Sequence, residues 1–290
     1  MNKVLAEIIA GVIPHKMTRN RWRGILRYGC CKSLRLKCKM RRDKTVPKYY
    51  LAVCAIAKNE GPYFQEWIEW HRSKGVEKFY IYDNESTDCT KEVLAPYIAS
   101  GLVEYRYWPG KKQQLAVYDN CFDSHRTEAR WIAVIDLDEF IMPIQDGTIP
   151  EFLRRMEAYS SVEINWLIYG SGGAKTKEPG GVMERFKRHS LPEHISNRHV
   201  KSIVDPRRVC SMTGAHEAAR LSGKSADSHG KRLKKGFRDR NPQHDVIRIN
   251  HYAVKSYEEF TAKHHKGSVR TGNARGLSYF DRYDLNDIEE

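Results

Sequence analysis

The chain has 290 residues, 40% of them hydrophobic, with six Trp and sixteen Tyr, which excludes a chain too polar to collapse around a core. Its formal net charge of +14 is concentrated before residue 49, where Glu7 and Asp43 are the only acidic residues. The rest of the chain is close to neutral, which argues against a nucleic-acid-binding body. The seven cysteines are an odd number with no C-x-x-C pair, as is typical of a reducing compartment.

The first segment is basic and partly apolar. Residues 4–13 form an apolar run that is interrupted by Glu7 and stopped by Pro14. A bilayer-spanning helix needs roughly twenty apolar residues, and a signal peptide has its basic residues before the apolar run, not after it. An apolar run followed by basic residues favours a helix lying in the interface of an anionic membrane. We therefore expect residues 1–48 to bind a membrane surface; a solvated arm or a nucleic-acid-binding tail are the alternatives.

From residue 49 onward, β-prone segments alternate with amphipathic ones. We expect strands at residues 49–56, 78–82, 102–107 and 131–135, and helices at about 62–74, 93–100 and 113–129. This alternation predicts an α/β fold with a mostly parallel sheet flanked by helices. A helix at 149–159 and a strand at 162–168 follow. The glycines near residue 170 then begin a loop-rich C-terminal third.

The segment 131–140 is the most informative part of the chain. A continuous apolar run ends in Asp136, Asp138 and Glu139. Such runs suit strands that are buried on both faces of a parallel sheet, where ligands bind beyond the carboxyl ends. In extended backbone, the side chains of Asp136 and Asp138 would point to the same side and repel each other unless a cation neutralises them. We therefore expect these two carboxylates to bind Mn²⁺ or Mg²⁺; a solvated acidic loop is the alternative.

Four segments carry a resemblance to a known family. They are Ala57-Lys58-Asn59-Glu60 followed by Glu66-Trp67-Ile68-Glu69-Trp70-His71, then Tyr82-Asp83-Asn84-Glu85-Ser86-Thr87-Asp88, then residues 131–140, and last Asn250-His251-Tyr252 with Lys255, Ser256, Phe260, Lys263 and Gly267. In this order they resemble glycosyltransferase family 92, a GT-A (Rossmann-like) type of nucleotide-sugar glycosyltransferase similar to family 2. The resemblance covers about residues 49–270, which we take as the catalytic domain, leaving 271–290 as a C-terminal tail.

The resemblance assigns roles to particular residues. It implies that the nucleotide-sugar is bound by Asn59, Glu60, Asp83, Asn84, Lys255 and Ser256. It also implies that His251 completes the metal sphere begun by Asp136 and Asp138, with Lys263 and Lys266 near the diphosphate. The alternatives are a polar turn and helix cap for residues 83–88, and a surface or capping role for His251.

The catalytic base is left open by the sequence. The family is regarded as inverting, which implies that one carboxylate takes a proton from the acceptor hydroxyl. Glu163, Glu178 and Glu217 are candidates, and the residue pattern does not rank them. The loops between residues 170 and 244 are expected to recognise the acceptor, because loops on a rigid scaffold usually carry selectivity.

The sequence thus predicts a metal-dependent glycosyltransferase that moves a hexose from a UDP-sugar to a glycan or lipid-linked acceptor. The expected place is the cytoplasm, peripheral on the inner face of the membrane, with no nucleic acid as a partner. One alternative is a nucleotidyltransferase on the same scaffold, although no glycine-rich loop follows the first strand. The other is a non-catalytic polyanion-binding protein, which the near-neutral body weakens.

Overall fold

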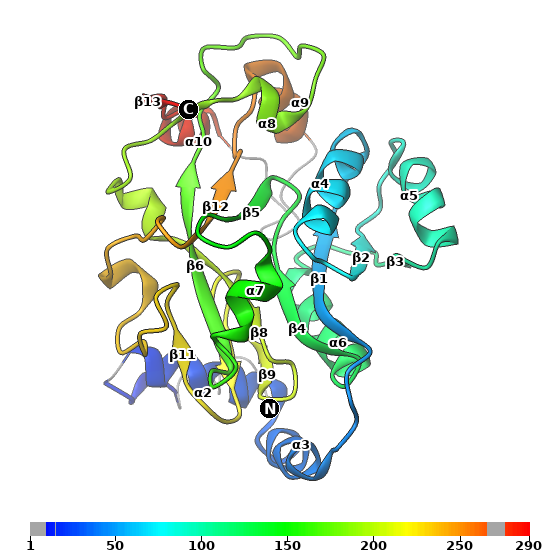
Figure 1. Ribbon diagram of the computed structural model, residues 1–290, viewed down its shortest axis with the longest axis vertical. Helices are drawn as coiled ribbons and strands as arrows, with labels where there is room; N and C mark the ends of the chain where they lie inside the picture. Colours follow the sequence, from blue (N-terminus) through cyan, green and yellow to red (C-terminus); the bar gives the residue numbers. More distant parts are fainter. Residues whose placement is uncertain (1–9, 15, 266–275) are drawn as a thin grey trace.

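The computed structural model describes residues 10–14, 16–265 and 276–290 (Figure 1). A nine-stranded mixed sheet forms the centre of this part, in the order β3-β2-β1-β4-β8-β6-β12-β5, with β11 paired to β6. Its strands are β1 (Tyr49–Ala57), β2 (Lys78–Asp83), β3 (Val103–Tyr107), β4 (Ala129–Val134), β5 (Glu139–Pro143), β6 (Ser161–Ile168), β8 (Val200–Val204), β11 (Ser225–Ala226) and β12 (Ile247–His251).

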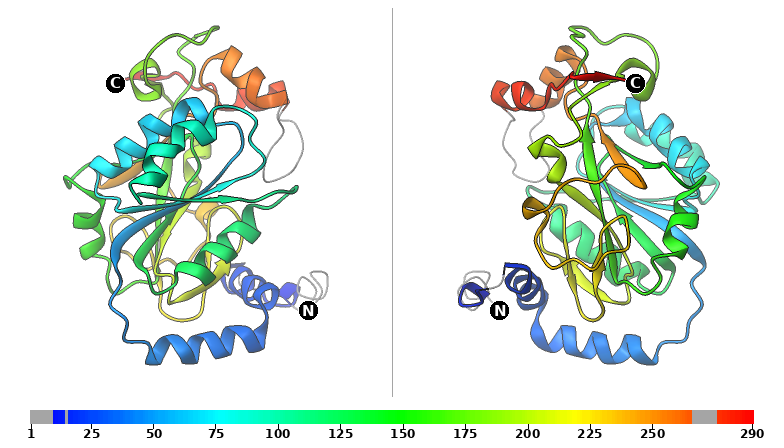
Figure 2. Two further views of the ribbon diagram at one scale, coloured as in Figure 1. Left: turned by 90° about the vertical axis from the view of Figure 1, so that its right-hand side faces the viewer. Right: turned by 60° about the vertical axis from the view of Figure 1, so that its left-hand side comes forward.

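The first half of the sheet is parallel, as the alternation of strands and helices predicted. β2, β1 and β4 pair in parallel, and β3 extends the set on the far side of β2. Helices α4 (Gly61–Ser73) and α5 (Thr90–Ala99) cover one face, and α6 (Gln114–His125) covers the other (Figure 2). β1 contributes to both cores, because Leu51, Val53 and Ala55 pack toward α4 while Ala52 and Cys54 pack toward α6. This two-sided burial explains why the strand is apolar without alternation.

The second half of the sheet is mixed, because β8 enters it from the loop-rich part of the chain. β8 pairs antiparallel with β4 on one side and with β6 on the other. The expectation of loops from residue 170 to 244 is therefore incomplete, since this stretch supplies a fully buried central strand. It also contains β7 (Arg188–His189), β9 (Val209–Met212), β10 (Ala218–Arg220), α8 (Val182–Arg185) and the short 3₁₀ helices Ile195–Arg198 and Phe237–Asp239. The α/β fold class itself is confirmed.

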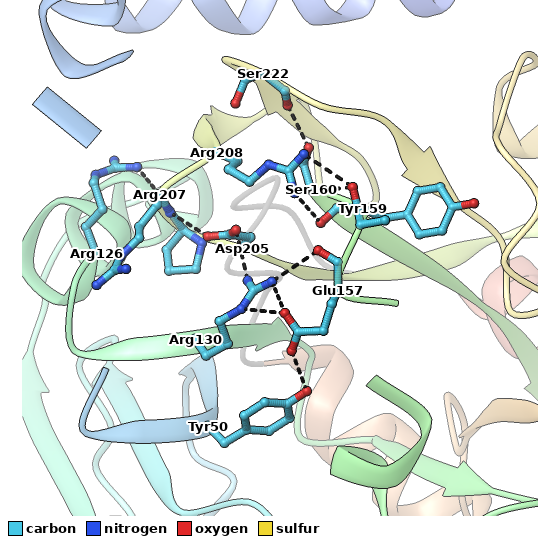
Figure 3. Close-up of polar contacts among 12 residues, drawn as sticks. Tyr50, Arg126, Arg130, Glu157, Tyr159, Ser160, Asp205, Arg207, Arg208 and Ser222 are labelled. Atoms are coloured by element: carbon cyan, nitrogen blue, oxygen red, sulfur yellow. Dashed lines mark hydrogen bonds and ion pairs between the residues drawn. The ribbon is translucent and has the colours of Figure 1, made fainter. Parts of the chain in front are cut away.

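The helix expected at 149–159 is shorter than predicted. α7 ends at Arg154 and begins with a capping box, in which Thr148 Oγ1 accepts from Glu151 N and the Glu151 side chain accepts from Thr148 N. Beyond α7, the Glu157 carboxylate accepts hydrogen bonds from Arg130 Nε and from the Tyr50 hydroxyl (Figure 3). The distance from Tyr50 Oη to Glu157 Oε1 is 2.7 Å. Arg130 also pairs with Asp205 at 2.9 Å, so this network joins β1, β4 and the turn after β8 at the amino-terminal ends of the parallel strands.

Residues 1–48, called the basic head below, contain two described helices that contact the rest of the domain. α2 (Lys16–Tyr28) and α3 (Cys30–Arg42) lie at the end of the molecule where β11 is found (Figure 1). Ile25 of α2 is buried with Cys210, Ala219 and Leu221, and Arg27 pairs with Asp119 of α6 at 3.1 Å. We expected residues 1–48 to bind a membrane surface, but the side chain of Ile25 in this segment is covered by protein. Residues 4–9 of the apolar run lie outside the described residues. In the part that the structure describes, no helix combines the length and the apolar character needed to cross a bilayer.

The C-terminal residues also pack on the domain. α10 (Leu277–Tyr283) follows α9 (Tyr257–His265), and β13 (Ile288–Glu289) pairs antiparallel with β7. Ser171 N donates to Asp284 at 2.6 Å, and Arg188 Nε donates to Asn286 O at 3.1 Å. The described residues of the expected tail therefore belong to the folded body. Lys266 and Gly267 lie outside the described residues.

Candidate active site

The acidic segment after β4 forms a turn. β4 ends at Val134, and Glu139 N donates to Asp136 O at 3.1 Å before β5 begins. The extended backbone expected for residues 136–138 is wrong, and with it the expectation that both aspartates point to one side. Asp136 accepts from Lys201 Nζ at 2.8 Å, whereas Asp138 accepts from Lys263 Nζ at 2.9 Å.

A compact group of possible metal ligands forms around Asp138. One ligand atom each from Asp138, Glu139 and His251 lies within 4.8 Å of the others, and no other such group was found among the described residues. Asp138 Oδ1 lies 3.6 Å from His251 Nε2. Asp138 and His251 are brought together as predicted, but Asp136 is not in the group because the turn directs it to Lys201. Glu139 takes the third place.

Two buried atoms of this group, Glu139 Oε1 and His251 Nδ1, form no hydrogen bond with any residue in the described ranges. Buried polar atoms are normally paired. Two carboxylates and an imidazole are a donor set that suits Mn²⁺ better than Mg²⁺, since Mg²⁺ favours oxygen alone. The residues present therefore fit a divalent cation.

Burial and neighbouring charges set the protonation of these groups. Burial raises the pKa of Asp138, but Lys263 and His251 outweigh burial and hold that pKa well below its usual range. Burial raises the pKa of Glu139 well above its ordinary value, against the opposing effect of Lys201. Burial also lowers the pKa of His251, which favours the neutral imidazole that metals bind.

A cavity of about 220 Å³ lies beside this group. Among its lining residues are Asn59 and Glu60 from the loop after β1, and Lys255 and Lys263 from the segment after β12. Lys263 Nζ lies 2.8 Å from Glu60 Oε1 as well as near Asp138, so it links the cavity to the acidic group. Asn59 and Lys255 have φ angles of 54° and 58°, an uncommon backbone conformation for residues other than glycine that is often found at functional sites.

Three other predicted nucleotide ligands have structural contacts. Asp83 accepts from Tyr105 Oη at 2.6 Å and from Ser86 N at 2.9 Å. Asn84 Nδ2 donates to the carbonyl oxygens of Trp108 and Gly110, which fixes the end of β2 to the chain after β3. Ser256 is fully buried, and its hydroxyl bonds to Glu259 in a capping box at the start of α9. For Asp83 and Asn84 these contacts agree with the alternative of a polar turn after β2. Contact of Asp83, Asn84 and Ser256 with a nucleotide stays a prediction.

None of the candidate bases lines the cavity beside Asp138. Glu163 is buried in β6 and pairs with Arg240. Glu217 is buried near α2, where Asn20 Nδ2 donates to its Oε2 at 3.3 Å. Glu178 accepts from Thr176 Oγ1 in an exposed loop and lines a separate cavity of about 420 Å³ with Glu66.

One charged residue of the site was missed by the sequence reasoning. Lys201 is buried in β8 and reaches both Asp136 and Glu139, the latter at 3.4 Å. Asp136 and Glu139 raise the pKa of Lys201 above its ordinary value, although burial opposes them. A lysine within a short apolar segment at 200–204 was the available signal, because a buried lysine needs an acidic partner.

The fold is a Rossmann-like α/β fold, and carboxylates, an imidazole and lysines gather beside a cavity at the carboxyl edge of its sheet. In such folds, this edge is where ligands bind. The chain belongs to glycosyltransferase family 92, whose model matches residues 49–289. This match confirms the family that the four sequence segments indicated, and with it the class of glycosyltransferases.

Individual proteins are similar to this chain over part of their length. A glycosyltransferase family 92 protein of Oryza sativa subsp. japonica is 31% identical over 218 residues, covering 73% of this chain and 35% of the relative. A galactan beta-1,4-galactosyltransferase of Arabidopsis thaliana is 29% identical over 178 residues, covering 56% of this chain and 34% of the relative. The chain thus spans about a third of the length of these relatives. The solved structure of S. aureus TarS 1-349 in complex with UDP-GlcNAc is 13% identical, with a TM-score of 0.36 over 54% of this chain and 45% of that one.

Proposed function

We propose that this domain transfers a hexose from a UDP-sugar to a glycan or lipid-linked acceptor, with Mn²⁺ as the preferred cofactor and inversion at the anomeric carbon. The observation that carries the proposal is the convergence of Asp138, Glu139 and His251 beside a cavity lined by Asn59, Glu60 and lysines. Membership of family 92 supports the reaction class. The relative named as a galactan galactosyltransferase makes UDP-galactose the first donor to test.

The acidic group would hold the cation, and the lysines would bind the diphosphate of the donor. Asp138, Glu139 and His251 would hold the cation, which when bound stabilises negative charge on the departing nucleotide diphosphate. Lys263 already bridges Asp138 and Glu60, so a diphosphate entering the cavity would exchange these carboxylates for phosphate oxygens at its ammonium group.

The protonation of Lys255 would respond to a bound phosphate group. Its ammonium group lies 4.3 Å from the centre of the Tyr63 ring, and burial together with Lys263 lowers its pKa. A dianionic ligand would favour the charged form of Lys255 and strengthen its own binding. Asn59 and Glu60 would contact the nucleoside from the loop after β1.

The basic head supports the proposal of membrane association. The exposed cations of α3 include Lys32, Arg35, Lys37, Lys39, Arg41 and Arg42. Each basic residue near an anionic membrane adds about 1 kcal/mol of attraction, so a subset of them would hold the protein at such a surface. We propose the cytoplasmic face as its place, and deletion of residues 2–44 should release the protein from the membrane fraction.

The central test is donor consumption by the purified chain. UDP-galactose, UDP-glucose and UDP-GlcNAc would each be incubated with and without Mn²⁺, and release of UDP measured by chromatography. We expect release of UDP from at least one donor, dependent on Mn²⁺ and abolished by Asp138→Asn. Exposed Glu193→Gln removes one charge elsewhere and should leave the rate unchanged. Full activity of a folded Asp138→Asn variant would refute the proposed role of this site.

A further inference from the structure

A strongly basic cavity lies away from the candidate active site. Its volume is about 380 Å³, and it is lined by Thr18, Arg21, Arg220, Gly223, Lys224, Ser225, Arg232, Leu233 and Lys234. Ser225 of β11 pairs with Ser161 at the start of β6, whereas His251 pairs with Ile168 at its end. The cavity and the acidic group are therefore near opposite ends of β6, roughly 20 Å apart at 3.3 Å per residue. Figure 1 shows β11 and α2 at the end of the molecule that contains this cavity.

Among the residues that the structure describes, five cationic ones and no acidic one line this cavity. Within the described residues, none of these five side chains makes an ion pair with a carboxylate. Arg21 Nε instead donates to Arg220 O at 2.7 Å, and Arg21 Nη2 donates to Leu221 O at 3.3 Å. Neutral carbonyl groups thus hold Arg21 beside Arg220. Repulsion between the cations of the cavity costs stability unless an anion offsets it.

Arg220 has unused hydrogen-bonding capacity. Its Nη1 donates to Ser225 Oγ, but its Nε is buried and has no hydrogen-bond partner in the part of the chain that the structure describes. Burial lowers the pKa of Arg220, and Arg21 and Arg232 act in the same direction, while Glu163 and Glu217 behind it oppose them. A guanidinium group has a planar fork of donors that matches a phosphate group, so Arg220 has the chemistry for such a ligand.

The loop that forms one wall is held rigidly. Ser160 N donates to Lys224 O at 2.8 Å, and Ser160 Oγ donates to Ser222 O at 2.6 Å. Arg208 binds the carbonyl groups of Ala158 and Tyr159 beside the same loop (Figure 3). Gly223, between Ser222 and Lys224 in this loop, has a φ of 73°. A Cβ atom at this position would clash with Ser160 and Arg208. This wall is therefore formed before any ligand arrives.

We propose that this cavity is a binding site for a phosphate group carrying two negative charges, distinct from the donor site. Arg21 and Arg220 bind it from the inner wall, and Lys224, Arg232 and Lys234 surround its opening. α2 supplies Arg21, so the site exists only when the basic head is docked on the body. The phosphate comes from a lipid headgroup or from a soluble phosphate compound, and the test separates these two sources.

The test compares two triple variants of the full chain that lose the same charge. Lys224→Ala/Arg232→Ala/Lys234→Ala removes the exposed cations of the cavity, and Lys37→Ala/Lys39→Ala/Arg41→Ala removes three exposed cations of α3. Binding of inorganic phosphate is measured by calorimetry in the presence of UDP and Mn²⁺, which occupy the donor site. Binding of phosphatidylcholine vesicles, with and without phosphatidic acid, is measured by sedimentation. Thermal melting confirms that both variants are folded.

We expect the cavity variant to bind phosphate at least about tenfold more weakly, since one charge-assisted hydrogen bond is worth that much, and the α3 variant to bind as wild type. A parallel loss of binding to phosphatidic acid vesicles in the cavity variant identifies a lipid headgroup as the source, and unchanged vesicle binding identifies a soluble phosphate. The proposal is overturned if wild type binds no phosphate, if the cavity variant binds it normally, or if both variants lose it equally.

Discussion

Lys201 Nζ lies 2.8 Å from Asp136 Oδ2, and this ion pair joins a strand from the loop-rich part of the chain to the acidic turn after β4. The same ammonium group is 3.4 Å from Glu139 Oε2. Lys201 thus lies beside Asp136 and Glu139, while Asp138 lies beside His251 and Lys263.

Loss of Lys201 should destabilise the domain. Lys201→Met leaves Glu139 fully buried without its cation, and removal of one partner of a buried ion pair costs about 3 kcal/mol or more. We expect a lower urea midpoint for this variant than for wild type. Lys231→Met, at an exposed position, is the control and should keep the wild-type midpoint. Equal midpoints for all three proteins would show that the ion pair does not stabilise the fold.

The three acidic residues should differ in their effect on Mn²⁺ binding. Asp138→Asn and Glu139→Gln each remove a member of the compact group, so each should weaken Mn²⁺ binding by about tenfold or more. Asp136→Asn should have a smaller effect, because Asp136 faces Lys201. Electron paramagnetic resonance of free Mn²⁺ measures all three affinities. The largest loss in Asp136→Asn would support the order of ligands expected from the sequence instead.

His71 should make the domain less stable in acid. Its Nδ1 donates to Trp67 O at 2.8 Å, and its Nε2 accepts from Ile141 N at 3.2 Å, so the buried ring joins α4 to β5 as a neutral imidazole. Burial lowers its pKa from 6.5 to about 4. The pKa of His71 is thus lower in the folded protein than in the unfolded one. Its contribution to the free energy of unfolding is therefore present above pH 6.5 and is lost as the pH falls through 4.

Protonation of His71 in acid should lower the free energy of unfolding by about 3 kcal/mol. Urea unfolding of wild type and His71→Leu at pH 7 and pH 4 isolates this contribution, since all other groups are common to both proteins. The variant should be less stable at pH 7 and should lose less stability on acidification. The same acid loss in both proteins would contradict a neutral His71.

Glu163 should have the opposite pH dependence. Burial raises its pKa from 4.5 to about 7, although Arg240 opposes this shift. A raised pKa of an acid gives stability that is present below pH 4.5 and is lost as the pH rises through 7, by about 3 kcal/mol. Glu163→Gln should remove this loss, which urea unfolding at pH 4.5 and pH 8 would measure. A wild-type slope in the variant would show that Glu163 is ionised throughout.

Much of the scaffold could be predicted from the sequence, because its signals are local. The parallel strands and the helices between them follow from apolar runs and helical spacing in neighbouring residues. Asp138 and His251 were found from motifs, and the structure brings them together, as it brings Asn59, Glu60 and Lys255 to one cavity.

Other features depend on contacts between distant residues. The insertion of β8 between β4 and β6 depends on antiparallel pairing that no local pattern encodes, so Lys201 could not be assigned to the acidic turn. Because residues 136–139 form a turn, Asp136 and Asp138 bind different lysines, which the two-residue spacing did not reveal. The sequence by itself determined the family, the α/β scaffold and the acidic segment through short-range patterns. The tertiary structure decided which charges meet, because burial and pairing are properties of the packed chain.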